Sequence, residues 1–93
     1  MDTNATVNVK RVRGKLARPG CEIYYELTGE GPALVFAHGL GGNHLSWWQQ
    51  VPAFCERYSC ITFAHRGFAP SSVIVGGPDA NDYADDFCSF LSF

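Results

Sequence analysis

The residues best suited to chemistry form a glycine-rich turn, His38-Gly39-Leu40-Gly41-Gly42. A short apolar run, Ala33 to Ala37, leads into this turn, and an aromatic-rich segment with Trp47 and Trp48 follows it. Glycines allow a sharp turn and a close approach of the backbone to a ligand, and free amides at the start of a helix can donate hydrogen bonds to an anion. The pattern therefore predicts a backbone site that binds negative charge, such as the oxyanion that forms when a carbonyl carbon is attacked.

Two other uses of a glycine-rich turn between a strand and a helix fit these residues less well. A dinucleotide-binding fingerprint needs a third glycine where the chain has His44, and an acidic residue where the next strand ends in Ala64. A phosphate-binding loop needs a lysine followed by a serine or threonine at the start of the helix, and this chain has neither there. Binding of an oxyanion is therefore the favoured interpretation.

A second stretch, Ala64-His65-Arg66-Gly67-Phe68-Ala69-Pro70-Ser71, follows the next predicted strand. Taken in order with the His-Gly turn, it makes residues 20–93 resemble the alpha/beta-hydrolase family. In that family a strand ends in a His-Gly turn, and an Asp-x-Arg-Gly-x-Gly-x-Ser stretch follows the next strand. Arg66, Gly67 and Ser71 match this stretch, whereas alanines at positions 64 and 69 replace its aspartate and its second glycine.

The resemblance implies a role for each residue of the turn. The amide of Leu40 would donate a hydrogen bond to the oxyanion, and His38 and Gly39 would shape the turn. The Trp47-Trp48 pair and the acidic start of the last helix are similar to those of family members with ester-hydrolase or lactonase-type activity. In a complete enzyme, His44 and Trp48 would contact a small, ester-like substrate.

The resemblance also defines the catalytic groups that this sequence lacks. The family nucleophile lies in a Gly-x-Ser-x-Gly elbow and is followed by an acid and then a histidine. None of the serines has glycines two residues to either side, and the last histidine is His65. We therefore expect no catalytic residue here: the chain would be the N-terminal part of a carboxylic-ester-type hydrolase and inactive alone. Cys55 or Cys60 beside His65 could form an unrelated catalytic pair, but both fall at apolar positions that favour ordinary core thiols.

The elements that would position the turn indicate an α/β fold. Two strand-forming runs around Pro19-Gly20, Val7–Leu16 and Glu22–Leu27, predict a hairpin. The apolar runs Ala33–Ala37 and Cys60–Ala64 are uninterrupted, which predicts two strands covered on both faces. A helix is expected between them over Leu45–Arg57, so the two strands should be parallel. Pro52 should bend this helix or delay its start.

A second helix is expected to begin after Asp79, which is well suited to cap it. Its apolar residues should all pack on the sheet, namely Tyr83, Phe87, Phe90 and Leu91. No stop signal ends this helix before Phe93. The sequence thus predicts one incomplete domain over residues 1–93, with a flexible leader at residues 1–6. Its fold would be a partial alpha/beta-hydrolase sheet, an N-terminal hairpin plus two parallel strands with two helices, truncated within a larger domain.

The strand at Ala33 to Ala37 suggests a second function. By resemblance, the strand at Cys60 lies between this strand and the hairpin, which leaves Ala33 to Ala37 as an apolar edge. An unpaired edge is a template for association with another chain. We therefore expect self-association through this edge, and the alternative to an enzyme part is a non-catalytic binding or interaction module that uses the edge or the Trp47-Trp48 patch.

Composition bounds the remaining partners and cofactors. The formal net charge of -2 gives no reason to expect nucleic acid or an anionic membrane as a partner. The first six residues lack the apolar core of a secretory signal, and no apolar run approaches the length of a membrane span, so we expect a cytoplasmic protein. The four cysteines are not at metal-ligand spacing, so neither a metal nor another cofactor is expected. They are expected to be free and buried, although oxidation would allow three pairings.

Overall fold

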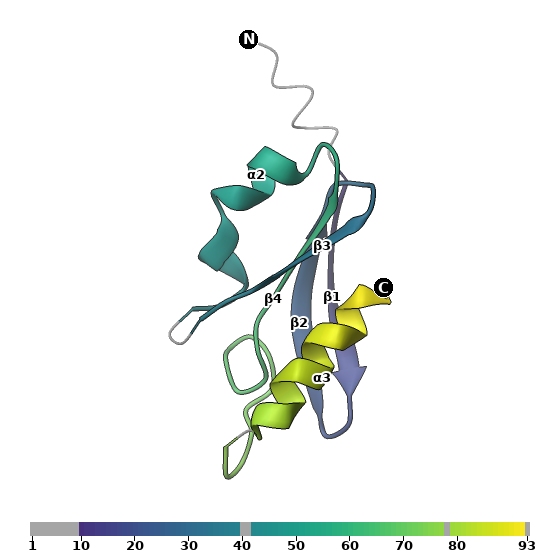
Figure 1. The fold of residues 1–93 in the computed structure, drawn as a ribbon. Coiled ribbons are helices and arrows are strands. Elements are labelled where there is room, and N and C mark those ends of the chain that lie inside the picture. Colours follow the sequence, from purple (N-terminus) through teal and green to yellow (C-terminus); the bar gives the residue numbers. More distant parts are fainter. Residues whose placement is uncertain (1–9, 40–41, 78, 93) are drawn as a thin grey trace.

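A computed structural model describes residues 10–39, 42–77 and 79–92 as one sheet flanked by helices (Figure 1). The sheet has four strands in the order β1-β2-β4-β3. The strands and helices, in chain order, are β1 Arg11–Arg18, β2 Cys21–Thr28, β3 Ala33–Ala37, the 3-10 helix η1 His44–Trp47, α2 Gln50–Phe54, β4 Ser59–Phe63 and α3 Ala80–Leu91. The predicted α/β class and the partial hydrolase-like sheet are confirmed.

The hairpin forms around the expected turn. β1 and β2 pair antiparallel with Arg18 opposite Cys21, so Pro19 and Gly20 make the connection. Gly20 has a φ of 79°, a conformation that glycine adopts at little cost. Within the described residues the first strand runs from Arg11 to Arg18, two residues beyond the predicted end, and residues 7–9 of the predicted run lie outside the described residues.

The two strands that lead into the motifs are parallel neighbours, as predicted. β3 pairs with β4 from Ala33 opposite Ser59 to Ala37 opposite Phe63. β4 is buried along most of its length, but the prediction that β3 is covered on both faces is wrong: Ala33 and Ala37 are exposed and the residues between them are half-buried. The reason is its place in the described sheet, where β3 has one neighbouring strand and β4 has two.

The single helix predicted over Leu45–Arg57 is instead two short ones, η1 and α2. Asn43 caps η1: its side-chain Oδ1 accepts from the amide of Leu45 at 2.8 Å. The chain then starts a new helix at Gln50, which places Pro52 in the first turn of α2, where a missing N–H leaves no helical hydrogen bond unmade. Of the two outcomes expected for Pro52, a bend or a delayed start of the helix, the structure shows the delayed start.

The helix α3 packs on one face of the sheet through its apolar stripe. Asp79 caps it as predicted, since its carboxylate accepts from the amide of Asn81 at 2.9 Å. Phe90 is fully buried against Ile23, Ile61 and Phe63. The prediction that Leu91 packs on the sheet is wrong, because 56 % of this residue is exposed. Successive residues of a helix point about 100° apart, so with Phe90 facing the sheet its neighbour points away from the sheet.

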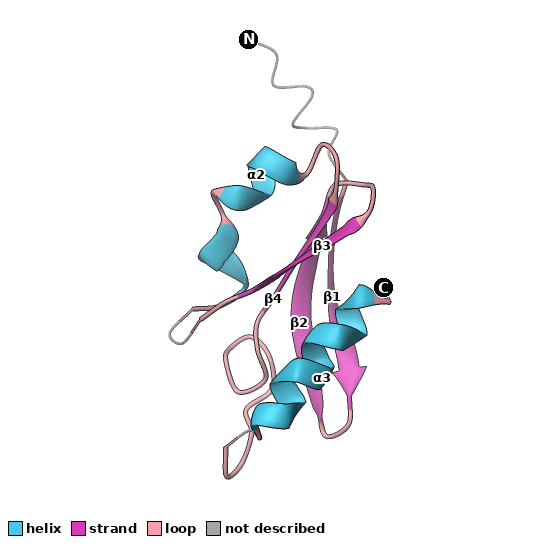
Figure 2. Ribbon diagram, viewed as in Figure 1, coloured by secondary structure: helices cyan, strands magenta, loops and turns pink. Residues whose placement is uncertain are grey.

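The other face of the sheet is more polar. Side chains alternate along a strand, so Glu26, Thr28 and Thr62 point away from α3 and line a hollow with residues of η1. Figure 2 shows α3 and the η1–α2 segment lying on either side of β3 and β4. Among the described residues, no helix is both long enough and apolar enough to cross a membrane.

Candidate functional site

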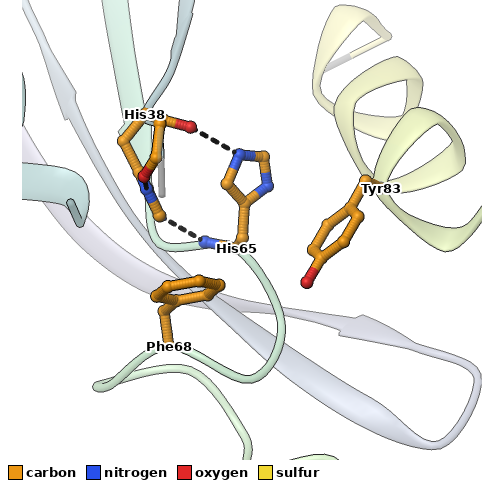
Figure 3. Close-up of a pocket in the computed structure, with 5 residues that line it drawn as sticks. His38, His65, Phe68 and Tyr83 are labelled. Carbon is orange, nitrogen blue, oxygen red and sulfur yellow. Dashed lines mark hydrogen bonds between the residues drawn. The ribbon is translucent and has the colours of Figure 1, made fainter. Parts of the chain in front are cut away.

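A cavity of about 320 Å³ lies where β3 and β4 end, at the start of the two motif loops (Figure 3). His38 and Gly39 enter it from the end of β3, His65 and Phe68 from the loop after β4, and Tyr83 from α3. Ligands of open α/β sheets bind outside the carboxyl ends of the strands. The cavity therefore lies at the end of the sheet where chemistry is expected.

Hydrogen bonds fix the protonation of the His38 ring. The backbone amide of His65 donates to Nε2 of His38 at 3.0 Å, so this nitrogen is an acceptor and carries no proton. The proton of the neutral ring is then on Nδ1, which donates to the carbonyl oxygen of Gly39 at 2.7 Å. His38 is 5 % exposed, and this buried ring ties the start of the turn to the neighbouring loop.

The Gly39 carbonyl oxygen receives a second hydrogen bond. The backbone amide of Gly42 donates to it at 3.0 Å, closing the turn over the intervening residues. Two donors therefore hold one carbonyl group in place. Leu40 and Gly41 lie outside the described residues, so the predicted oxyanion donor itself is not described.

His65 contacts the same strand end through its side chain. Its Nε2 lies 3.0 Å from the carbonyl oxygen of His38, and this nitrogen must donate because the carbonyl can only accept (Figure 3). Nδ1 is then the unprotonated nitrogen, and it is buried with no hydrogen-bond partner in the described part of the chain. Burial, and next the nearby His38 ring, lower the pKa of His65 below 6.5. The ring is therefore neutral at physiological pH.

Aromatic rings surround this pair of imidazoles. The His65 ring packs edge to face against Tyr83 and Phe63, with centroids 5.0 and 5.1 Å apart. The His38 ring contacts Phe68 in the same way at 5.2 Å. The phenylalanine rings offer no hydrogen-bonding group, so the two imidazoles and the Tyr83 hydroxyl supply the polar side-chain groups of the cavity lining.

The loop after β4 is held by two of the residues that match the family stretch. Arg66 is buried and donates to both carboxylate oxygens of Asp86 at 2.8 Å. The Ser71 hydroxyl donates to the carbonyl of Ala64 at 2.6 Å and accepts from the amide of Tyr24 at 2.8 Å. These side chains point into the fold, so they position the loop rather than contact a ligand.

The two predicted binding residues lie elsewhere. His44 and Trp48 line a second hollow, of about 190 Å³, on the sheet face opposite α3. Nε2 of His44 lies 3.4 Å from a carboxylate oxygen of Glu26, and Trp48 is 69 % exposed. The structure therefore does not bring them together with His38 and Gly39, and their contact with substrate stays a prediction.

Sequence reasoning missed three residues of the cavity: His65, Phe68 and Tyr83. A signal for His65 was present, because it lies two residues after the end of β4 and parallel neighbouring strands end at the same edge of a sheet. Helical spacing predicts that Tyr83 belongs to the packing stripe of α3. Its place beside His65 depends on how the helix crosses the sheet, which no local pattern specifies.

Cys60 forms no catalytic pair with His65. Burial raises the pKa of the Cys60 thiol to about 11, and this residue lies at the opposite end of β4 from the cavity. The expectation that all four are buried is wrong, because Cys88 on α3 is exposed and Cys21 and Cys55 are half-buried. No group of three or more potential metal ligands occurs among the residues that the structure describes.

Comparisons with known proteins agree on the fold. A family model described as the alpha/beta hydrolase fold matches residues 32–92. Non-heme chloroperoxidase CPO-A1 of Kitasatospora aureofaciens is 34 % identical over 76 residues, which are 81 % of this chain and 28 % of that protein. Fluoroacetate dehalogenase of a Burkholderia species is 36 % identical over 56 residues, 60 % of this chain and 18 % of that protein.

A solved structure shows the same fold at lower sequence identity. E-2-(acetamidomethylene)succinate hydrolase superposes with a TM-score of 0.78 and 24 % identity, over 89 % of this chain and 31 % of that one. The chain therefore spans less than a third of the length of each of these three proteins.

Proposed function

Because this chain belongs to the alpha/beta hydrolase family, we propose that it carries the oxyanion-binding turn of a carboxylic-ester-type hydrolase, at His38, Gly39 and Leu40. We further propose that the chain does not hydrolyse esters by itself. A small, ester-like substrate would bind only in a complete domain, which would supply the nucleophile, the acid and the catalytic histidine.

The observation that carries the proposal is the held carbonyl of Gly39. The His38 ring and the Gly42 amide both donate to this oxygen, next to the cavity. In a trans peptide the carbonyl oxygen and the following amide hydrogen point in opposite directions. The held Gly39 carbonyl therefore supports a turn with a fixed shape beside the cavity, and donation by the Leu40 amide, which lies outside the described residues, is part of the proposal.

The lack of activity follows from what an oxyanion donor can do. One such donor typically lowers the barrier by about 3 kcal/mol, but only after a nucleophile has attacked the carbonyl carbon. The sequence has no Gly-x-Ser-x-Gly elbow and no histidine after His65. The thiol of Cys60, with its raised pKa, does not supply a thiolate in its place.

Binding of a small oxyanion tests the turn without requiring catalysis. We expect phenylphosphonate, titrated into the isotope-labelled chain, to shift the backbone amide resonances of residues 39–42 in NMR spectra. The physical reason is that a backbone amide with no internal acceptor gains a charge-assisted hydrogen bond. Leu40→Pro removes this one donor and should abolish the shifts, whereas Leu45→Ala, at an exposed site on η1, should preserve them.

Two results would overturn the proposal in different ways. If phenylphosphonate shifts no amide of the turn, or shifts it equally in Leu40→Pro, the turn does not bind oxyanions. If the chain with blocked thiols hydrolyses 4-nitrophenyl acetate and Leu40→Pro does not, the turn acts in a chain that is active alone, and the claim of inactivity fails.

A second function, as an interaction module, is favoured by the charges on the two sheet edges. The edge strand β1 carries four cations, Arg11, Arg13, Lys15 and Arg18, which discourage pairing with another copy. The edge strand β3 has the sequence Ala-Leu-Val-Phe-Ala and carries none. We propose that, if the chain associates with itself, it does so through the edge from Ala33 to Ala37.

Sedimentation analysis distinguishes this module from a monomer. The chain is expected to form concentration-dependent dimers, and Ala33→Lys is expected to remain monomeric, because it places a charge on the edge at an exposed position. Lys15→Ala on the opposite edge serves as the control and should not reduce association. A wild-type chain that stays monomeric at high concentration would exclude the module.

A further inference from the structure

We infer that His65 is a positioning residue for the turn after β3, and that it acts through His38 only while both imidazoles are neutral. The inference concerns the shape of the turn, not its ligand. It therefore stands or falls separately from the proposed binding of an oxyanion.

Residue 65 contacts residue 38 at two points. Its backbone amide donates to the His38 ring at Nε2, and its ring donates to the His38 carbonyl, both at 3.0 Å. These bonds join two loops that are 27 residues apart in sequence. The first of them also fixes the His38 tautomer, and with it the proton that reaches the Gly39 carbonyl. The polar contacts of His65 therefore extend, through the His38 ring, to the Gly39 carbonyl.

A proton on His38 breaks this arrangement. The only nitrogen free to receive it is Nε2, because Nδ1 already carries a hydrogen. Nε2 would then be a donor facing the amide of His65, which is also a donor. The hydrogen bond would be replaced by a repulsive contact between two donors, and both N–H groups would be left without an acceptor.

A proton on His65 is equally unfavourable. It would bind Nδ1, which is buried without a hydrogen-bond partner in the described residues. The titratable groups that face this ring are His38, with centroids 4.4 Å apart, and Tyr83 on α3. Asp86 on α3 favours the charged ring, but its carboxylate already binds Arg66 and Arg18. The buried cation would therefore lack a dedicated counterion.

A proton on either imidazole would therefore destabilise the closed turn. The pKa of His65 is below 6.5 in the folded chain, so an opened turn binds the proton more readily than a closed one. The closed turn is then fully stabilised above pH 6.5 and loses stability as the pH falls below it. For each proton linked to opening, the population of the open form rises by up to about tenfold per pH unit.

Amide hydrogen exchange measured by NMR reports this opening directly. The readout is the protection of the His65 amide, corrected for intrinsic exchange, relative to the Ala64 amide, which donates to the Tyr24 carbonyl in the sheet. We expect the ratio to fall severalfold or more between pH 7.5 and pH 5.5. A ratio that is constant over this range would overturn the inference even without any variant.

Two substitutions of His65 separate positioning from a merely structural role. His65→Gln keeps a side-chain amide that can donate to the His38 carbonyl but does not titrate, whereas His65→Ala removes the donor. We expect His65→Ala to lower the protection of the amide at position 65 and of Gly42 at every pH. His65→Gln should restore it at pH 7.5 and weaken the pH dependence of the ratio.

The matched control is His44→Gln, which removes a histidine of η1 that pairs with Glu26, outside the cavity. It should leave the pH dependence of the ratio unchanged. The inference fails if His65→Gln keeps the full pH dependence, or if His44→Gln removes it. If His65→Ala does not fold, the wild-type ratio and the two glutamine variants still decide the question.

Discussion

Asp86→Asn is expected to lower the free energy of unfolding by about 3–5 kcal/mol, which is a large part of the total stability of a small domain. Asp86 is fully buried, and its carboxylate lies between two arginines of different elements. Arg66 donates to it twice at 2.8 Å, and Arg18 donates once at 3.0 Å. Removing the negative charge would leave the buried Arg66 guanidinium without its main counterion.

The pKa of Asp86 also indicates that its negative charge stabilises the fold. Burial alone would raise its pKa, but the hydrogen bonds from Arg66 and Arg18 outweigh burial and hold the pKa below 3.8. The carboxylate therefore stabilises the fold above pH 3.8, and this stabilisation is lost as the pH falls below that value. The wild-type chain should lose this stabilisation on acidification, whereas Asp86→Asn should show less change between pH 5 and pH 3.

Urea denaturation followed by circular dichroism measures both effects. The matched control is Asp85→Asn, the same change at an exposed position on the same helix, which should shift the free energy of unfolding by no more than about 0.5 kcal/mol. Equal losses of unfolding free energy in the two variants would show that the hydrogen bonds of Asp86 with Arg66 and Arg18 contribute nothing specific to stability. The loop after β4 would then need another explanation for its fixed position.

Gly29→Ala is expected to cost about 3 kcal/mol or more, because the substitution combines backbone strain with a steric clash. Gly29 follows β2, is buried and has a φ of 95°, a conformation that side chains rarely adopt. A Cβ atom at this position would collide with the backbone carbonyl oxygen of Cys55 and would come within 2.6 Å of that of Tyr58. Both obstacles are backbone, so neither can rotate away.

Gly20→Ala separates the clash from the strain. Gly20 has a φ of 79°, but a Cβ atom there would meet nothing within 4 Å. This control should lose only about 1–2 kcal/mol, the ordinary cost of a left-handed alanine. If the two variants lose the same free energy in urea denaturation, the close approach of the β2–β3 connection to the segment before β4 does not contribute to stability.

Local patterns in the sequence were enough to predict the strands, the last helix and one end of the candidate site. Alternation and turn residues predicted the hairpin, and two short apolar runs with a helical segment between them predicted the parallel pair β3 and β4. The His-Gly turn follows the first of those strands, so the place of His38 and Gly39 at the strand end needed no tertiary information. These signals are local, since each depends on a few neighbouring residues.

The tertiary structure alone decided which side chains meet. His65 and Tyr83 reach the cavity from separate elements, and Asp86 is buried because Arg18 and Arg66 converge on it from β1 and from the loop after β4. His44 and Trp48 follow the same turn as His38, yet they line the hollow on the sheet face opposite α3. Such pairings depend on the angle at which a helix crosses a sheet and on the mutual neutralisation of buried charges. Both are set by contacts between residues far apart in the chain, so no local pattern contains them.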